Sequence, residues 1–163
     1  MDNQDYTTSI LVDQSPLEVY EAINYVRGWW SEEIEGPTDE LNKEWFYHYK
    51  DIHLCKMKVV SLKPGELVVW EVVENKFNFI EDEKEWVGNR IVFEITKEGP
   101  KTRMTFTQQG LRDSYECYQV CNDGWNNYVG NSLYKLITTG KGEPNPKEGE
   151  GFNKELADRW QLH

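Results

Sequence analysis

The chain has little positive charge. Among its 163 residues, 18 are lysine or arginine and 29 are aspartate or glutamate, so the formal net charge is −11. Duplex nucleic acid and anionic membranes are bound by a basic face that neutralises phosphates, and this chain has no excess of basic residues. The composition therefore argues against both kinds of partner, and the acidity is the ordinary mark of a well-solvated surface.

Long apolar runs and cysteines are also scarce. No run approaches the roughly 20 apolar residues that a membrane span needs, and the polar start at 1–5 is unlike a signal peptide. The three cysteines, an odd number, lie among apolar or aromatic neighbours, which indicates reduced thiols in a reducing compartment. We therefore expect a cytoplasmic protein without a membrane span.

The sequence shows no metal-binding pattern. Cys117 and Cys121 are four residues apart and could supply half of a zinc site. The other candidate ligands are without recognisable spacing: His48, His53, Cys55 and His163. We predict buried, uncoordinated cysteines, no metal and no cofactor.

Aromatic residues are what the chain has in abundance, with seven tryptophans, nine tyrosines and six phenylalanines. The length suits one domain with its own core and is too short for two. We predict a domain over 1–142 and a tail over 143–163. The tail begins with a linker rich in glycine, proline, lysine and glutamate, which ends near Gly151, and Phe152 to Trp160 has the spacing of one short helix.

The first part of the chain predicts a strand and two short helical elements. Tyr6 to Val12 is rich in β-branched residues and ends at a polar, proline-containing turn. Ser15 and Glu18 have capping-box spacing, with proline at the first helical position. We expect this helix to bury Leu17, Tyr20 and Ile23, with Val19 beside them.

After Gly28 the pattern changes to an indole pair followed by a meander of strands. Tyr25 to Ser31 is either a second short helix or a turn that presents Trp29 and Trp30. Ile34 to Asn42 reads as an acidic surface loop. The expected strands then cover 44–50, 52–62, 67–74, 90–96 and 102–108.

Two connections in this meander carry further signals. Lys63 to Glu66 has proline second and glycine third, the pattern of a type II turn. Asn75 to Gly88 is strongly acidic yet contains Phe77, Phe79 and Trp86, which suits a rim loop that contacts a partner or covers a cavity. Acidic runs such as 81–85 could also steer a basic protein partner, although such runs are usually solvated faces.

The last long periodic segment, Ser114 to Thr139, predicts one amphipathic helix that ends at Gly140. One of its faces is aromatic and carries Cys117, Cys121, Trp125, Tyr128, Ser132 and Leu136. Strands flanked by segregated helices indicate an α+β fold. We expect a curved antiparallel sheet of about six strands wrapped around this helix, with the aromatic face turned inward.

A cavity between such a sheet and helix would be lined by large rings. Strand alternation and helix face select Trp30, Trp45, Tyr47, Trp70, Phe93, Phe106, Tyr118, Trp125 and Tyr128. The competing interpretation is a solid core, because burying each ring stabilises a small domain by about 1.5–3 kcal/mol without any ligand. If there is a cavity, the polar edges of tryptophan and tyrosine favour an aromatic or amphipathic ligand.

Catalytic signals are weak. His48 and His53 lie beside a hairpin and Glu71 lies within an apolar strand, and each could act as a general base. The chain has no nucleophile elbow, no glycine-rich phosphate loop and no Walker pattern. We therefore predict a protein without catalytic residues.

Several of these motifs together resemble the START-like, or SRPBCC, superfamily. Its opening motif resembles Ser15 to Ile23, and Trp29-Trp30 is similar to the double tryptophan of the AHSA-type branch, named after activators of a heat-shock-protein ATPase. The same branch has counterparts of Pro64-Gly65, Val69 to Val72, Thr105 to Thr107 and the segment from Gly124 to Gly140. The resemblance covers roughly residues 6–142.

The resemblance implies a helix-grip fold with a cavity between the sheet and the C-terminal helix, where members often bind hydrophobic small molecules. It implies two alternatives as well. One is a co-chaperone-like module that binds a chaperone or another protein. The other is a cyclase-like or hydrolase-like enzyme, as in other branches of the superfamily.

Overall fold

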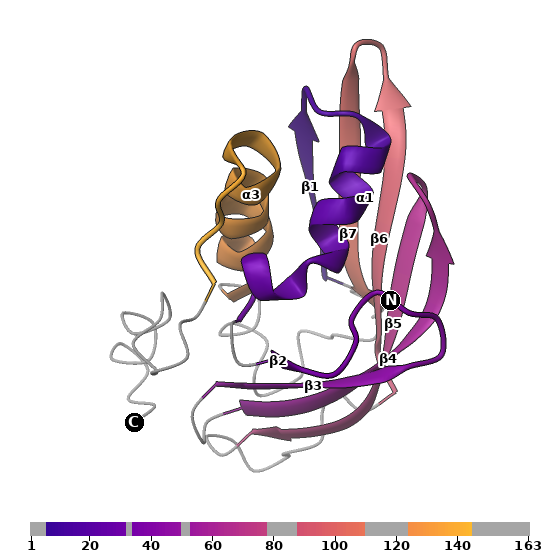
Figure 1. Ribbon diagram of the computed structural model, residues 1–163, viewed down its shortest axis with the longest axis vertical. Coiled ribbons are helices and arrows are strands. Elements are labelled where there is room, and N and C mark those ends of the chain that lie inside the picture. The colour runs from indigo at the N-terminus through magenta and orange to yellow at the C-terminus, as the bar shows by residue number, and fades with distance from the viewer. Residues whose placement is uncertain (1–5, 32–33, 50–52, 78–87, 110–123, 145–163) are drawn as a thin grey trace.

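The structure is a computed structural model that describes residues 6–31, 34–49, 53–77, 88–109 and 124–144. One antiparallel sheet of seven strands dominates it, in the order β1-β7-β6-β5-β4-β3-β2. The helices lie on one side of this sheet, inside its curve (Figure 1). This is a helix-grip α+β fold, as the sequence predicted, with one strand more than expected.

The strands are β1 (Tyr6–Val12), β2 (Ile34–Glu35), β3 (Glu44–Tyr49), β4 (His53–Lys63), β5 (Leu67–Phe77), β6 (Arg90–Glu98) and β7 (Lys101–Gln109). The additional strand is β2, which pairs with β3 through Ile34 and Tyr47 in a segment expected to be a loop. Its pairing partner lies on β3, so the local acidic sequence gave no sign of it. β5 also runs three residues further than its apolar stretch.

The sheet bends along β4. The pairing of β4 with β5 shifts register between Lys56 and Met57 and again between Val59 and Ser61. Such bulges bend a strand and increase its twist. As a result β3 and the lower part of β4 pass beneath the helices, while β6 and β7 stand beside α1 (Figure 1).

The turns between strands follow their sequence signals. The Glu66 N–H donates to the Lys63 carbonyl over 2.8 Å, and Gly65 has the positive φ of 73° that the third position of a type II turn demands. The turn between β6 and β7 is shorter than predicted. Both strands extend further toward it, and Glu98 pairs with Lys101 across Gly99-Pro100.

The first helix, α1 (Pro16–Asn24), begins with the predicted capping box. The Glu18 N–H donates to Ser15 Oγ, and the Ser15 N–H donates to the Glu18 carboxylate. The expected buried stripe is partly wrong, because Val19 and Ile23 are buried whereas Leu17 is 51% exposed. With about 3.6 residues per turn, Leu17 lies about 160° around the helix from Val19 and therefore points away from the sheet.

A 3-10 helix, η1 (Val26–Gly28), follows α1, which settles the open choice between a short helix and a turn in favour of the helix. Trp29 and Trp30 come directly after it and are fully buried. The Trp29 indole N–H donates to the Ile23 carbonyl over 3.1 Å and so fixes the chain against the end of α1.

The C-terminal helix is described over residues 124–139. Its middle is a π-helical segment, η2 (Tyr128–Leu133), and its end is α3 (Tyr134–Thr139). Gly140 ends the helix with φ of 87° and an N–H bond to Leu136, as predicted. The expected first part of this helix, from Ser114, lies outside the described residues, as do Cys117, Tyr118 and Cys121. Within the described parts of the chain, no helix is long and apolar enough to cross a membrane.

Candidate functional site

The predicted rings come together between the sheet and the C-terminal helix. Trp45 and Tyr47 lie on β3, Trp70 on β5, Phe93 on β6 and Phe106 on β7, each in the buried phase of its strand. The helix contributes Trp125 and Tyr128, and Trp30 enters from the end of η1. We call these eight residues the aromatic cluster; the ninth candidate, Tyr118, lies outside the described residues.

Strand alternation explains why these rings meet. In β3 the exposed fraction is 0% for Trp45 and 2% for Tyr47, but 47% for Phe46 between them. In β7 the buried residues are Thr102, Met104, Phe106 and Gln108, which alternate over the same face. The period of two therefore identifies the helix-facing side chains.

Trp30 lies at the centre of the aromatic cluster. Its ring stacks on Tyr47 at a centroid distance of 4.2 Å and an interplanar angle of 22°. Trp125 lies 5.1 Å away and Tyr128 6.0 Å away, so Trp30 joins the helix to the sheet. On its other side the Trp70 ring is nearly parallel at 6.1 Å.

Trp29 also belongs to this arrangement, although it was not among the predicted site residues. Its centroid lies 6.2 Å from Trp30, 6.4 Å from Trp70 and 5.9 Å from Phe93. The sequence predicted a short helix or a turn that presents both indoles, and only Trp30 was named as a candidate for the cavity wall. Both indoles follow the 3-10 helix η1, and both are buried among the same rings.

Two hydroxyl groups meet at the edge of the aromatic cluster. The Tyr47 and Tyr128 oxygens are 3.5 Å apart and join β3 to the C-terminal helix. Burial, and next the neighbouring Tyr128, raise the pKa of Tyr47 well above its usual range, and the neighbouring Trp30 side chain opposes this rise. Tyr47 therefore stays neutral, as does the Cys55 thiol on the paired strand, whose pKa is also raised by burial.

A series of hydrogen bonds between neutral side chains also starts from the aromatic cluster. The Trp125 indole N–H donates to Gln108 Oε1 over 2.7 Å, and Gln108 Nε2 donates to Asn89 Oδ1 over 2.8 Å. Gln108 and Asn89 are both buried, and the sequence reasoning missed both. The sequence did contain a signal for Gln108, because it is a polar residue at a position of β7 where strand alternation predicts a buried side chain.

Five tryptophans are buried among the described residues, and they differ in how their N–H groups are used. Trp29 and Trp125 donate to defined acceptors, the Ile23 carbonyl and Gln108. Trp30, Trp45 and Trp70 are equally buried, but in the described part of the chain their Nε1 atoms have no hydrogen-bond partner. Leaving a buried donor unsatisfied costs about 1–3 kcal/mol, so three such groups in one cluster call for an explanation.

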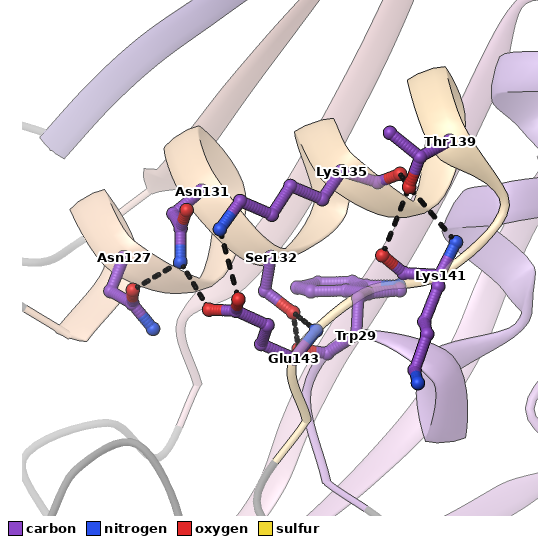
Figure 2. Close-up of polar contacts among 8 residues, drawn as sticks. All are labelled: Trp29, Asn127, Asn131, Ser132, Lys135, Thr139, Lys141 and Glu143. Carbon is purple, nitrogen blue, oxygen red and sulfur yellow. Dashed lines mark hydrogen bonds and ion pairs between the residues drawn. The ribbon is translucent and has the colours of Figure 1, made fainter.

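A polar segment, residues 140–144, runs back along the C-terminal helix beside Trp29, and we call it the C-terminal strap (Figure 2). Ser132 Oγ donates to the Trp29 carbonyl over 2.6 Å and accepts the Glu143 N–H over 2.8 Å. The Glu143 carboxylate accepts from Lys135 and from Asn131, each over 2.9 Å. Gly142 fits without a side chain because a Cβ there would lie too close to the Gly28 and Ser132 carbonyl oxygens.

Glu71, the one catalytic candidate whose side chain the structure describes, does not join the aromatic cluster. Glu71 lies between Trp70 and Val72, which are buried on the helix side, so its carboxylate is on the other side of β5. His48 and His53 lie in β3 and β4, and their side chains are outside the described part of the structure. No group of three or more metal-binding side chains occurs among the described residues.

No protein-family model matches the chain, and no curated protein matches it. Solved structures do. The Aha1 dimer from Colwellia psychrerythraea has 21% identity and a TM-score of 0.69, over 85% of this chain and 99% of that one. DynU16, a putative protein in the dynemicin biosynthetic locus, has 16% identity and a TM-score of 0.63, over 85% of this chain and 48% of that one.

A third similar structure is Mll3558 from Rhizobium loti, with 17% identity and a TM-score of 0.65 over 83% of this chain and 96% of that one. At identities this low, the structural similarity establishes the fold alone, and the function has to be argued from the site. The chain therefore belongs to the class of helix-grip, START-like folds, in agreement with the motifs of the sequence.

Proposed function

We propose that the chain binds a hydrophobic or aromatic small molecule between the sheet and the C-terminal helix, without catalysing a reaction. The observation that carries this proposal is the set of three unsatisfied indole N–H groups inside the aromatic cluster. A phenylalanine at these positions would provide apolar burial without the cost of an unsatisfied donor. A bound molecule offers a reason for the donors to be there.

The helix side of the cluster supports the same proposal. Tyr128 begins the π-helical segment η2, and such widened turns are found frequently at functional sites. The Tyr47 and Tyr128 hydroxyl groups and the Gln108 amide add neutral polar atoms beside the rings. A mostly apolar wall with a few polar groups is the usual composition of a small-molecule site.

The proposed cavity wall is the predicted set of nine side chains, with Trp29 added to it. It comprises Trp29, Trp30, Trp45, Tyr47, Trp70, Phe93, Phe106, Tyr118, Trp125 and Tyr128. We further assign the chain to the AHSA-type branch on the strength of its Trp29-Trp30 pair and its Gly124 to Gly140 segment. A cytoplasmic location suits the buried free thiol of Cys55.

A thermal-shift screen against lipids, aromatic compounds and polyketides tests the proposal. A ligand that binds only the folded state raises Tm by mass action, by an amount that grows with ligand concentration. Trp30→Leu should remove the ligand-induced rise, measured from the variant's own Tm. The matched control is Tyr134→Leu, on the same helix but 40% exposed, which should retain it. No rise with any compound class would refute small-molecule binding.

A second candidate function is that of a co-chaperone-like interaction module. It is supported by the likeness of the fold to the Aha1 dimer and by the net charge of −11, which favours a basic partner surface. A pull-down with a purified chaperone, together with the molar mass in solution, tests this candidate. Chaperone binding that survives Trp30→Leu would separate this function from the first.

A further inference from the structure

The two edges of the sheet are finished in different ways. At one edge, β2 is only two residues long and includes the exposed, charged Glu35. The Arg27 guanidinium donates to the Ile34 carbonyl over 3.0 Å and to the Gly36 carbonyl over 2.9 Å. A short strand, a charge and carbonyl groups that are already occupied all discourage a further strand from pairing there.

At the other edge, β1 lacks these features. Its seven residues, Tyr6–Val12, include no charged residue and no proline, and they pair with β7 in one unbroken register. Successive residues of an antiparallel strand direct their backbone N–H and C=O groups to opposite sides. Alternate groups of β1 therefore point away from β7, toward a side where the described residues include no further strand (Figure 1).

The side chains of β1 also suit pairing with another strand. Thr7, Ser9 and Leu11 lie on the face turned away from the helices, since Ile10 and Val12 between and beside them are buried. Leu11 is 38% exposed on that face. An uncharged, extended edge that exposes an apolar side chain is a template for pairing with a further strand.

The C-terminal helix runs beside β1 and presents an exposed flank there. The Tyr6 hydroxyl donates to Asn126 Oδ1, which places the first described turn of the helix at the start of the strand. Asn126, Gly130 and Tyr134 follow one another at intervals of four residues, and all three are exposed. A Cβ at Gly130 would meet no atom within 4 Å, so this flank has room for a neighbouring molecule.

We propose that β1 is an interaction surface on which a second copy of this chain adds its own β1, antiparallel and about a two-fold axis at Ser9. In this register Ser9 faces the partner's Ser9, Thr7 faces the partner's Leu11, and Thr8 faces the partner's Ile10. Every facing pair is uncharged, and Leu11 is covered. Since β1 is the only open edge in the described structure, this pairing uses it up and the assembly closes as a dimer.

Other occupants fit this edge less well. The C-terminal residues 145–163 include no valine, isoleucine or threonine, so they are poor strand formers. A charged strand from another protein would find no counter-charge on β1. The proposed small-molecule site has no residue on β1, so the dimer and that site can be tested independently of each other.

Sedimentation equilibrium of the full chain measures this association. The mass of the wild type should rise with concentration from 19.3 kDa toward twice that value. The dissociation constant should fall at high salt, because salt screens the repulsion between two copies that each carry a net charge of −11. A dissociation constant that rises with salt would contradict pairing through an uncharged edge.

A charge at the axis is the sharpest variant. Ser9→Lys should raise the dissociation constant by about 10-fold or more, because two lysines then face each other. The Arg103 guanidinium, which donates to Ser9 Oγ over 3.0 Å, adds to that repulsion. The matched control is Thr105→Lys, which pairs with Ser9 in register but lies on β7, one strand inside the edge, and should leave the constant nearly unchanged.

An equal mixture of Ser9→Lys and Ser9→Glu should restore the dimer as a mixed pair, because lysine then faces glutamate across the axis. A wild type that stays monomeric at every concentration would overturn the proposal, as would a dimer that is equally tight in Ser9→Lys. An equal loss in Thr105→Lys would show that any added charge weakens the dimer, and would overturn it too. Species larger than a dimer would overturn the closed two-fold pairing.

Hydrogen exchange provides a readout that needs no variant. Amide groups on the outer side of β1 should exchange more slowly when the wild type is concentrated enough to associate, because they then donate to the partner copy. The amide groups of β2 should exchange at the same rate in both conditions. Slower exchange confined to strands other than β1 would contradict the proposal.

Discussion

Two regions beside the C-terminal helix are built on opposite terms. In the aromatic cluster large rings are buried, and three indole donors have no acceptor among the described residues. At the C-terminal strap, Ser132, Lys135 and Asn131 hold Glu143 through short hydrogen bonds (Figure 2). Ser132 is the only one of these three that is fully buried.

This difference separates the polar contacts that hold the helix in place from the aromatic rings that the helix covers. Polar contacts at the strap fix the position of the helix along η1, because Ser132 bonds both the Trp29 carbonyl and the Glu143 N–H. Burial of the rings gives the larger share of the stability but leaves polar atoms unused. The fold is therefore specified by hydrogen bonds at the strap and has unmet hydrogen-bonding capacity in the aromatic cluster.

The largest effect is expected from a truncation inside the aromatic cluster. Trp70 is fully buried and contacts Trp29, Trp30, Trp45 and Phe93. Trp70→Ala should lower the free energy of unfolding by about 3–5 kcal/mol, measured by urea denaturation. Phe46→Ala, on the exposed side of β3, is the control and should cost far less. Similar losses in both variants would contradict a core centred on the cluster.

The next largest effect is expected at the junction of helix and strap. Ser132→Ala leaves the buried Trp29 carbonyl and the Glu143 N–H without their partner, which should cost about 1–3 kcal/mol of the free energy of unfolding. Thr138→Ala on the same helix removes a hydroxyl bonded only to the preceding turn, at Tyr134. Chemical denaturation should show a clear loss for Ser132→Ala and almost none for Thr138→Ala.

A steric test of the strap follows. Gly142→Ala places a methyl group 2.9 Å from the Ser132 carbonyl oxygen and closer still to that of Gly28. We expect a loss of about 1–2 kcal/mol in the free energy of unfolding, at the lower end of the overpacking range because the exposed strap can shift. Gly130→Ala meets no atom within 4 Å and is the control. Equal thermal denaturation midpoints would contradict a tightly seated strap.

The smallest effect concerns the carboxylate of Glu143. Its pKa is lowered by the hydrogen bond from Lys135, then by that from Asn131. A folded-state pKa below the unfolded one means that the contribution is complete above the unfolded pKa and is lost as the pH falls through the folded pKa. Glu143→Gln should therefore cost less than about 1 kcal/mol at neutral pH, since the pair is exposed to solvent.

The pH dependence of that difference is the measurement. Urea denaturation of the wild type and of Glu143→Gln should give different free energies of unfolding at pH 7 and converging values in acid. High salt should shrink the difference as well, because it screens the exposed pair. A difference that grows in acid would show that the carboxylate is not stabilised in the folded state.

Much of the fold could be predicted from periodicity. Alternation placed Trp45, Tyr47, Phe93 and Phe106 on the buried face, and the capping box at Ser15 and the stop at Gly140 were read correctly. Leu17 was assigned to the buried stripe wrongly, because apolar side chains lie on more than one face of this helix and packing against the sheet selects the face of Val19 and Ile23. The strand at Ile34 was missed because its evidence lies in the partner strand.

The candidate site was predicted less completely. Trp29 was left out because a segment that could be either a helix or a turn gives no rule for where each of two adjacent indoles points. Gln108 and Asn89 were left out because their role depends on Trp125, which meets them only in the fold. Whether the predicted rings line a cavity, and whether Tyr118 joins them, stays a prediction.

The sequence by itself determined which side chains are buried along most strands, where α1 begins and where the C-terminal helix ends, since these depend on local period and on residues that cap or break a helix. Only the tertiary structure decided which indole N–H groups find an acceptor. That outcome depends on atoms brought from distant strands and helices to within about 3 Å of one another, and no local pattern encodes such distances.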